Sequence, residues 1–358
     1  MKIDLLHVES LRCFESLSLA PGPGLNWLLG RNGAGKTSIL EAAYILSRGH
    51  SFRTGGRSAP CRHGSKRYLI HATLTRSRHA GISLGLVREG DRWEARRDGE
   101  SLGSLAPLFE ACPVVYFGPE SPQLVVGPAD GRRSFLDWSV FHVEHTSLDL
   151  WRRWRRALRQ RNALLRSDAP TASFEPWEHE LARVADAIDG LRQACVATLG
   201  PCLGAEAAWL VPELGAVSLE YRPGWDTGIG LQRQLAEQRS RDRERGFTQS
   251  GAHRADWLLR FERVASKDHL SRGQAKSVAL AYLLGQTRWL RDRIGEFPLL
   301  CLDDLESELD AEHAARVVAW LSDKPLQVWL TATETPDAAR RRDEARMFHV
   351  EHEGVTPA

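Results

Sequence analysis

The sequence lacks the features that mark several classes of protein. Its cysteines stand without any CxxC pair, at positions 13, 61, 112, 195, 202 and 301. Scattered thiols of this kind predict reduced side chains rather than a disulfide framework or a zinc site. No apolar run approaches the roughly 20 residues that cross a bilayer, and the start, MKIDLLHVES, lacks the apolar core of a signal peptide. We therefore expect a cytoplasmic protein without a membrane partner.

An excess of charge of either sign is also missing. Lysine and arginine number 48 and aspartate and glutamate 46, so the formal net charge is only +2. Net charge therefore gives no evidence for or against a nucleic-acid partner, and any basic surface has to be local. A content of 42% hydrophobic and 26% charged residues in 358 positions is typical of a globular protein with two or three domains.

The order of apolar patterns predicts an α/β body at both ends of the chain and a helical insert between them. Strands are expected at 3–8, 25–29, 68–76, 82–88, 298–304 and 326–333. Helical periodicity covers 134–200, 229–243 and 276–294. These patterns place domain boundaries near 115/116 and 244/245, which gives domains 1–115, 116–244 and 245–358. The pentapeptide FHVEH occurs at 141–145 and 348–352 and is too short to indicate a repeat.

The string GRNGAGKT at 30–37 matches G-x-x-x-x-G-K-[ST] completely and lies between an apolar strand and a helix. Glycines let backbone N–H groups turn toward phosphate oxygens, and the helix N-terminus adds partial positive charge. Lys36 is expected to reach the β- and γ-phosphates and Thr37 to ligate Mg²⁺. A chance match is the alternative. The predicted nucleotide-binding residues here are Gly30, Arg31, Asn32, Gly33, Ala34, Gly35, Lys36, Thr37 and Ser38.

A site of this kind needs acids at the end of a neighbouring strand, and LLCLDD at 299–304 supplies two. Asp303 is placed to hold Mg²⁺, usually through water, and Asp304 to orient or deprotonate the attacking water. The alternative is that the aspartates only cap the helix that follows, which is plausible for one of them.

The stretch LSRGQAK at 270–276 places Ser271 and Gly273 at the start of a helix. Taken alone, Ser271 is an ordinary helix cap. Upstream of a strand that ends in two acids, the stretch has the arrangement of ATP-binding-cassette ATPases. There the serine hydroxyl and glycine amide bind the γ-phosphate of ATP held by a partner subunit. We therefore assign Ser271, Gly273 and Gln274 to the nucleotide of a second copy, with Lys36, Asp304 and Ser271 as catalytic residues, and expect a homodimer that forms on ATP binding.

The segment WRRWRRALRQRNALLR at 151–166 holds seven arginines and no acid. On a helix, Arg152, Arg156 and Arg159 line one side, opposite the tryptophans and leucines. This pattern suits either a solvated face over a packed stripe or a surface that binds DNA phosphates without reading bases. The arginines at 239–245 alternate with acids and predict surface ion pairs. Arg132 and Arg133 are open to two interpretations, a contact with DNA or support of the nucleotide loop.

Several strings together resemble the RecF family, whose ATPase heads are related to those of Rad50 and SMC proteins. They are GRNGAGKTSILEAAYILSRGHSFR (30–53), PESPQLVVGPADGRRSFLDW (119–138), QRNALL (160–165), GAHRADW (251–257), LSRGQAK (270–276) and DDLESELD (303–310). The resemblance covers nearly the whole chain. It implies an α/β, ABC-type (Rad50/SMC-like) P-loop ATPase head whose insert is a compact, mainly helical arm instead of a coiled coil.

The resemblance also implies an activity and partners. RecF-like proteins bind ATP and Mg²⁺, close as dimers on DNA duplexes and on single-strand/duplex junctions, and help RecO and RecR load RecA at gaps. Arg12 aligns with an arginine near the nucleotide, and Glu120 or Gln123 stands where transporter relatives have a Mg²⁺-sensing glutamine. TATE at 331–334 replaces their histidine, and Asp304 replaces a longer glutamate, so we expect weak, DNA-dependent ATP hydrolysis. The rival interpretations are a nucleotide-gated scaffold with negligible hydrolysis and the ATPase subunit of a transporter.

Overall fold

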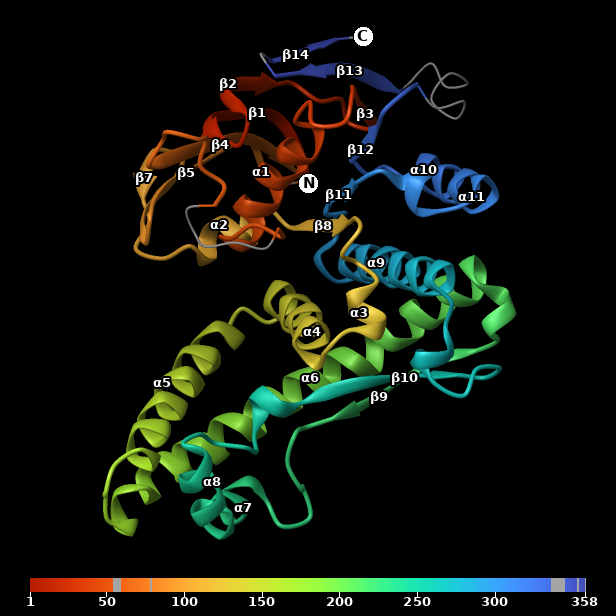
Figure 1. Ribbon diagram of the computed structural model, residues 1–358. Helices are drawn as coiled ribbons and strands as arrows, with labels where there is room; N and C mark the ends of the chain where they lie inside the picture. Colours follow the sequence, from red (N-terminus) through yellow and green to blue (C-terminus); the bar gives the residue numbers. More distant parts are fainter. Residues whose placement is uncertain (54–58, 78, 336–344, 353, 358) are drawn as a thin grey trace. The chain divides into compact units, whose positions relative to one another are not determined.

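The computed structural model describes residues 1–53, 59–77, 79–335, 345–352 and 354–357. The chain divides into two compact units (Figure 1). The first unit combines Met1–Ser121 with Leu290–Ala358, and the second is the continuous segment Pro122–Trp289. An α/β body therefore draws on both ends of the sequence, with a mainly helical insert between its two parts, as the sequence predicted.

A six-stranded sheet of the first unit positions the phosphate loop. Its strand order is β14-β13-β3-β12-β11-β8, in which all neighbours are parallel except the edge pair β13 and β14. The central strands LNWLL and VWLTA are buried at every position, as parallel strands covered on both faces usually are. The bounds are β3 Leu25–Leu29, β8 Val114–Phe117, β11 Leu299–Leu302, β12 Val328–Ala332, β13 Arg346–Glu351 and β14 Gly354–Pro357.

The second sheet of this unit is antiparallel, with the order β2-β1-β4-β5-β6-β7. In β4, buried residues alternate with more exposed ones, which is the pattern of a sheet with one solvated face. Helix α1, Lys36–Arg48, contacts strands of both sheets, and its side chains Ile39 and Leu40 belong to one core with residues of both. The strands are β1 Lys2–Leu11, β2 Phe14–Leu19, β4 Arg67–Arg76, β5 His79–Glu89, β6 Arg92–Arg97 and β7 Glu100–Ser101, and the further helices are α2 Ala106–Ala111, α10 Leu305–Glu308 and α11 Ala311–Ser322.

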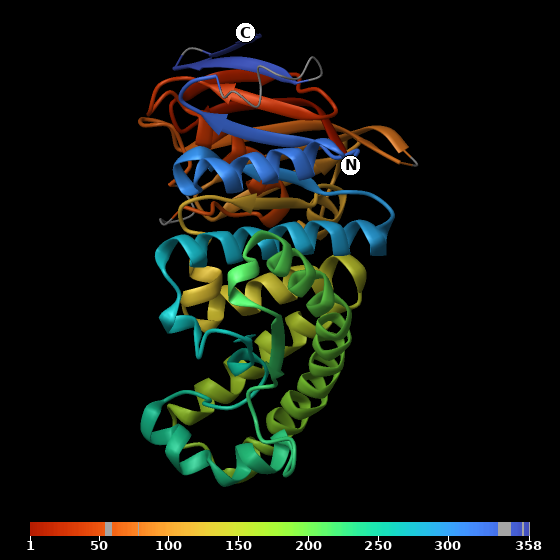
Figure 2. The same cartoon turned by 90° about the vertical axis from the view of Figure 1, so that its right-hand side faces the viewer.

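The second unit is mainly helical (Figure 2) and contains one antiparallel pair of strands, β9 and β10. Its core contains Trp154 and Ala157 of α5 packed with Leu181 and Ile188 of α6. Helix α9 begins in this unit and ends in the first. The bounds are α3 Gln123–Val126, α4 Ala129–Val143, α5 Ser147–Leu165, α6 Glu175–Leu210, β9 Val217–Arg222, α7 Leu231–Glu237, α8 Arg239–Arg245, β10 Asp256–Phe261 and α9 Arg272–Ile294, with 3₁₀ turns at Thr171–Ser173, Pro212–Leu214, Ala252–Arg254 and Lys267–His269.

The division into units differs from the predicted domain boundaries mainly at the C-terminal side. The sequence assigned 245–289 to the last domain, whereas these residues belong to the second unit. The pairing of β10 with β9 along six residue positions explains the difference, because it joins the segment after 245 to the helical insert. No pattern in the sequence had marked β9 or β10 as strands.

Three further observations concern membrane spans, cysteines and metal ligands. In the part of the chain that is described, no helix is both long and apolar enough to cross a membrane. All six cysteines lie within that part and all are free thiols. The described residues also contain no cluster of three or more histidine, cysteine or acidic side chains suited to a metal ion.

Candidate nucleotide-binding site

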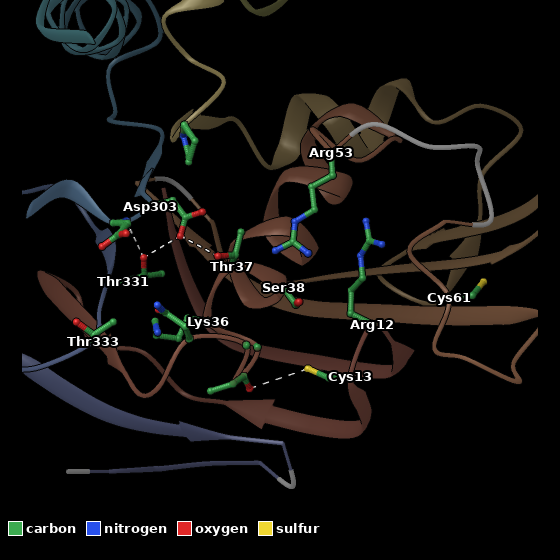
Figure 3. Close-up of a pocket in the computed structure, with 16 residues that line it drawn as sticks. Arg12, Cys13, Lys36, Thr37, Ser38, Arg53, Cys61, Asp303, Thr331 and Thr333 are labelled. Carbon is green, nitrogen blue, oxygen red and sulfur yellow. Dashed lines mark hydrogen bonds between the residues drawn. The ribbon is translucent and has the colours of Figure 1, made fainter. Parts of the chain in front are cut away.

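A cavity of about 580 Å³ lies in the first unit, beside the ends of the parallel strands β3, β11 and β12 (Figure 3). The segment 32–38 of the predicted phosphate loop lines one part of it. Asp303, Asp304 and Thr331 follow or end two neighbouring strands and line another part. Parallel strands bring their carboxyl ends to one edge of a sheet, so residues more than 260 positions apart in sequence meet in one pocket.

The backbone of the phosphate loop requires its glycines. Gly30, Gly33 and Gly35 have φ angles of 155°, 85° and 110°, a region that other residues rarely adopt. A Cβ atom on Gly30 would lie 2.5 Å from the carbonyl oxygen of Val350, and one on Gly35 would lie 2.7 Å from the sulfur of Cys13. The loop then turns directly into α1, whose first residue is Lys36. Lys36, Thr37 and Ser38 of this helix start line the pocket, and the start of a helix is a place that favours an anion.

Lys36 is folded over the loop that precedes it. Its ammonium group donates to the carbonyl oxygens of Gly30, at 2.5 Å, and Arg31, at 3.1 Å. Burial lowers the pKa of Lys36, and the nearby carboxylates of Asp304 and Asp303 oppose that shift. With two of three donors used, one N–H remains to bind a phosphate oxygen. Gly30 and Arg31 thus hold the lysine through their backbone, while the remaining predicted loop residues line the cavity.

Asp303 is a buried carboxylate surrounded by hydroxyl groups. Its Oδ1 accepts hydrogen bonds from Thr37, at 3.0 Å, and Thr331, at 2.8 Å, and its Oδ2 accepts one from Tyr116, at 3.2 Å. Burial raises the pKa of Asp303, whereas these hydroxyls, by stabilising the charged form, act in the opposite direction. Among the described residues, its hydrogen-bond partners are neutral hydroxyls. An anionic oxygen beside the hydroxyl of Thr37 fits the oxygen ligands that Mg²⁺ prefers.

Asp304 has an unusual backbone conformation at the edge of the pocket. Its φ of 53° and ψ of 46° are left-handed, and it precedes the short helix α10. Its side chain makes no capping hydrogen bond, although it occupies the N-cap position. The structure therefore contradicts the alternative that Asp304 only caps the helix that follows. Its backbone N–H instead donates to the hydroxyl of Thr331, at 2.8 Å.

The sequence alone indicated no function for the segment Ser51–Arg53. In the structure each of its residues contacts or lines the site. Ser51 donates to the buried carboxylate of Glu41, at 2.5 Å, and Phe52 stacks on Tyr116 with ring centroids 3.8 Å apart. Arg53 lines the cavity. Arg12, which the resemblance placed near the nucleotide, also lines the cavity.

Glu41 holds Arg12 through two hydrogen bonds of 2.9 and 2.5 Å. The side chain of Glu41 is itself fully buried, so this pair has a fixed place at the rim of the pocket. Of the residues considered for the Mg²⁺-sensing position, neither Glu120 nor Gln123 lines the cavity, whereas the neighbouring Pro119 does. Thr331 and Thr333, from the segment TATE at 331–334, also line it.

Ser271, Gly273 and Gln274, the signature residues assigned to the nucleotide of a second copy, belong to the second unit and do not line the cavity. Ser271 caps α9: its hydroxyl accepts the N–H of Gln274, at 3.1 Å, and its own N–H donates to the side chain of Gln274, at 3.0 Å. The capping alternative is thus present in the single chain. Because the Ser271 hydroxyl accepts a hydrogen bond in this capping arrangement, its proton remains available to an outside acceptor. Ser271 and Gly273 are both exposed.

The arginines of α5 separate into two groups. Arg152, Arg156 and Arg159 are exposed, with Trp154 buried on the opposite side, as the helical spacing predicted. Arg161 is fully buried and pairs with Glu178, at 3.1 Å, and Asp242, at 2.7 Å. Part of the arginine-rich segment therefore holds the second unit together, and only the exposed face is open to a ligand.

Two interpretations of other arginines need correction. Arg132 is buried in the second unit and binds both carboxylate oxygens of Asp256, at 2.7 and 2.9 Å, so it neither is exposed for a contact with DNA nor bonds to the nucleotide loop. Arg133 donates to the carbonyl oxygen of Ala255, at 2.8 Å, and also pairs with Asp130. The cluster at 239–245 is not confined to surface ion pairs, because Asp242 is fully buried on Arg161. Spacing alone gave no sign of these long-range partners.

Comparisons with known proteins agree with this geometry. The AAA domain model matches residues 5–47, which include the phosphate loop. A solved RecF structure with ATP, from the RecFOR pathway, covers 99% of this chain and 97% of its own at a TM-score of 0.90 and 21% identity. An SMC head bound to the C-terminal winged-helix domain of ScpA covers 100% of this chain and 98% of its own, at a TM-score of 0.58 and 12% identity.

These structural likenesses show the fold, which is that of an ABC-type P-loop ATPase head with a compact helical insert. The sequence comparison goes further. The DNA replication and repair protein RecF of Stenotrophomonas maltophilia (strain R551-3) is 44% identical over 357 residues, which cover 98% of this chain and 98% of that protein. A likeness of this degree over the full length of both chains shows that the protein belongs to the RecF family of DNA replication and repair proteins.

Proposed function

We propose that this chain is an ATP-dependent DNA-binding protein of recombinational repair and replication restart. Two copies close on DNA when ATP is bound and separate after slow hydrolysis. In this role the protein works in the cytoplasm with RecO and RecR, which assist the loading of RecA at gapped DNA. The family assignment supports this function, as does the solved relative described as a recombination mediator with ATP in the RecFOR pathway. The same assignment does not favour a transporter subunit.

The observation that carries the proposal is the meeting of Thr37 and Asp303 beside the phosphate loop, with 3.0 Å between hydroxyl and carboxylate oxygens. In the proposed site the loop N–H groups and Lys36 bind the phosphates of ATP, and Thr37 and Asp303 hold Mg²⁺. The ion, when bound, neutralises charge that develops on the phosphates during transfer. Asp304 orients the attacking water from the edge of the same cavity.

A second copy completes the site in this proposal. Ser271, Gly273 and Gln274 are exposed or half-buried at the start of α9, where helix N–H groups and a hydroxyl proton can bind a γ-phosphate. ATP then lies between the phosphate loop of one copy and the signature residues of the other. The dimer depends on the γ-phosphate, because ADP leaves the signature residues without their ligand.

DNA is the second ligand in this proposal. Arg152, Arg156 and Arg159 form an exposed cationic face on α5 and have no ion-pair partner among the described residues. Arginine side chains of this kind bind phosphates without reading bases, so little sequence preference and a strong dependence on salt are expected.

The test is a comparison of Lys36→Met with the wild type and with Lys66→Met, which changes an exposed lysine far from the phosphate loop in sequence. We expect Lys36→Met to lose tight ATP binding and, with it, the ATP-stimulated retention of duplex DNA on a filter. Lys66→Met should keep both. If Lys36→Met retains DNA as the wild type does with ATP, nucleotide and DNA binding are separate and the proposed function is wrong.

The scaffold alternative remains the second candidate, because Asp304 has a shorter side chain than the glutamate it replaces. Asp304→Asn distinguishes the two. For an ATPase, this substitution abolishes phosphate release while ATP binding persists. Phosphate release that is equal in wild type and Asp304→Asn, at the background rate, would favour the scaffold.

A further inference from the structure

Thr331 connects the two acidic residues of the site through one hydroxyl group. Its Oγ1 donates to Oδ1 of Asp303 and accepts the backbone N–H of Asp304, each at 2.8 Å (Figure 3). The side chain is 2% exposed and lines the same cavity as both acids. No other hydroxyl among the described residues bonds to both acids.

The sheet explains why this residue can reach both. Strands β11 and β12 are parallel, and Leu302 is opposite Leu330, so the next positions, Asp303 and Thr331, emerge side by side at the end of the two strands. Neighbouring residues at one register position of a parallel sheet point to the same face. A short hydroxyl-bearing side chain at position 331 therefore meets the carboxylate of position 303 directly.

The two bonds restrict different degrees of freedom. The bond to Oδ1 limits rotation of the Asp303 carboxylate, which Thr37 and Tyr116 also hold. The bond from the N–H of Asp304 holds that residue in its left-handed conformation, with a φ of 53°. Since the backbone conformation sets the direction of the Cα–Cβ bond, it also sets where the Asp304 carboxylate points in the cavity.

We propose that Thr331 is a positioning residue that aligns the metal-holding Asp303 and the water-orienting Asp304 together. The proposal rests on the proposed function of these two acids. A hydroxyl at position 331, rather than the bulk of the side chain, is what the site requires. Groups that orient the ligands of a metal contribute about 10- to 100-fold to metal affinity or activity.

Two variants separate the hydroxyl from the packing. Thr331→Val keeps the size and branching of the side chain but removes the hydroxyl. Thr331→Ser keeps the hydroxyl and loses a methyl group. For each we would measure the single-turnover rate of ATP hydrolysis and, in the Asp304→Asn background, the Mg²⁺ concentration at which binding of a fluorescent ATP analogue is half-maximal. Thermal unfolding without nucleotide monitors the fold.

We expect Thr331→Val to slow hydrolysis and to raise the half-maximal Mg²⁺ concentration, each by about tenfold or more, with Mg²⁺-saturated nucleotide affinity within threefold of the wild type. Thr331→Ser should stay within threefold of the wild type in the hydrolysis rate, the half-maximal Mg²⁺ concentration and the Mg²⁺-saturated nucleotide affinity. The inference is wrong if Thr331→Val behaves like the wild type, or if Thr331→Ser is impaired as much as Thr331→Val. If Thr331→Val does not fold, Thr331→Ser alone provides the test, and an impaired Thr331→Ser contradicts the inference.

The wild type separates this inference from the function on which it rests. A wild-type protein that binds the nucleotide with Mg²⁺ but shows no difference from Thr331→Val contradicts only the role of Thr331. A wild-type protein that binds no nucleotide at any Mg²⁺ concentration contradicts the proposed function, and the role of Thr331 with it.

Discussion

Two residues that line the cavity, Arg12 and Asp304, have left-handed backbone conformations, with φ angles of 54° and 53°. Only Ser10 and Asp98 share this feature among the described residues other than glycine. A single residue held there costs on the order of 1 kcal/mol or more, so the surrounding contacts have to compensate. Glu41 does so for the side chain of Arg12, and Thr331 does so for the backbone of Asp304.

His253 shows how burial changes the chemistry of one side chain. It belongs to the GAHRADW segment, and its Nε2–H donates to the carbonyl oxygen of Thr248 at 3.1 Å. Its Nδ1 is buried and has no hydrogen-bond partner among the described residues. Burial lowers the pKa of His253 from 6.5 to about 4. The imidazole of the folded protein is therefore neutral near pH 7, on the order of three units above its pKa.

This lowered pKa predicts a loss of stability in acid. Above pH 6.5 the histidine is neutral in both states and has no effect. As the pH falls from 6.5 toward 4, the unfolded chain binds a proton that the folded protein does not, which destabilises the fold by at most about 3 kcal/mol. We expect His253→Gln to reduce the slope of stability against pH in this range, measured by urea unfolding.

His63→Gln serves as the control, because His63 is exposed. It should retain the slope of the wild type. An equal slope for His253→Gln and the wild type between pH 6.5 and 4 would show that this buried imidazole is not the group responsible.

At the scale of elements, the second unit is held by buried and partly buried ion pairs between segments that are far apart in sequence. Arg161 of α5 binds Glu178 of α6 and Asp242 of α8, and Arg132 of α4 binds Asp256 of β10. Removing one partner of a buried pair costs about 3–5 kcal/mol, because an unpaired charge stays behind. The segments QRNALL and GAHRADW, which indicated the family, therefore contribute to the fold of the helical unit rather than to the nucleotide site.

The sequence correctly predicted those elements whose local residue pattern alone indicates both their secondary structure and their burial. LNWLL and the phosphate loop were placed correctly, because a fully apolar strand and a glycine-rich turn determine their structure locally. The pentapeptide FHVEH shows the limit of such reasoning: Phe141–Val143 belong to α4, whereas Phe348–Glu351 belong to β13. Only the partners of each copy, β3 and β14 in the second case, decide between helix and strand.

The site shows the same limit. Lys36, Thr37 and Asp303 could be predicted from spacing, since a phosphate loop and a strand that ends in acids have recognisable patterns. Thr331 and Tyr116 could not, because a lone threonine or tyrosine at the end of an apolar strand has no pattern of its own. Their role depends on the order of β8, β11 and β12 in the sheet.

The exposed face of α5 leads to a prediction for DNA binding. We expect Arg152→Ala combined with Arg156→Ala to weaken binding to any DNA sequence and to reduce the salt slope of the binding constant by about 2, one unit for each phosphate that an arginine no longer neutralises. Fluorescence anisotropy with a labelled duplex, measured from about 50 to about 200 mM salt, gives both the affinity and the salt slope.

The control for these arginines is Arg222→Ala combined with Arg260→Ala. Both side chains are exposed in the same unit, but they pair with Glu220. This variant should keep the affinity and the slope of the wild type. If the α5 variant keeps the wild-type slope as well, its arginines form an ordinary solvated surface.

At the scale of the whole molecule, the two units divide the machinery between them. The phosphate loop and both acids belong to the first unit, and the signature residues belong to the second. Ser271 and Gly273 are exposed and do not line the cavity, and in the proposed function they bind the nucleotide of a second copy. ATP shared between two copies is the central claim of the proposed function, and it makes the γ-phosphate part of the interface.

The most direct test is the mass of the Asp304→Asn protein in solution, measured by light scattering with ATP, with ADP and without nucleotide. We predict a dimer with ATP and a monomer in the other two states. Ser271→Arg in the same background should still bind ATP but remain a monomer, because the larger side chain blocks the γ-phosphate contact. The same mass in all three states, with ATP bound, would contradict the sharing of ATP between two copies.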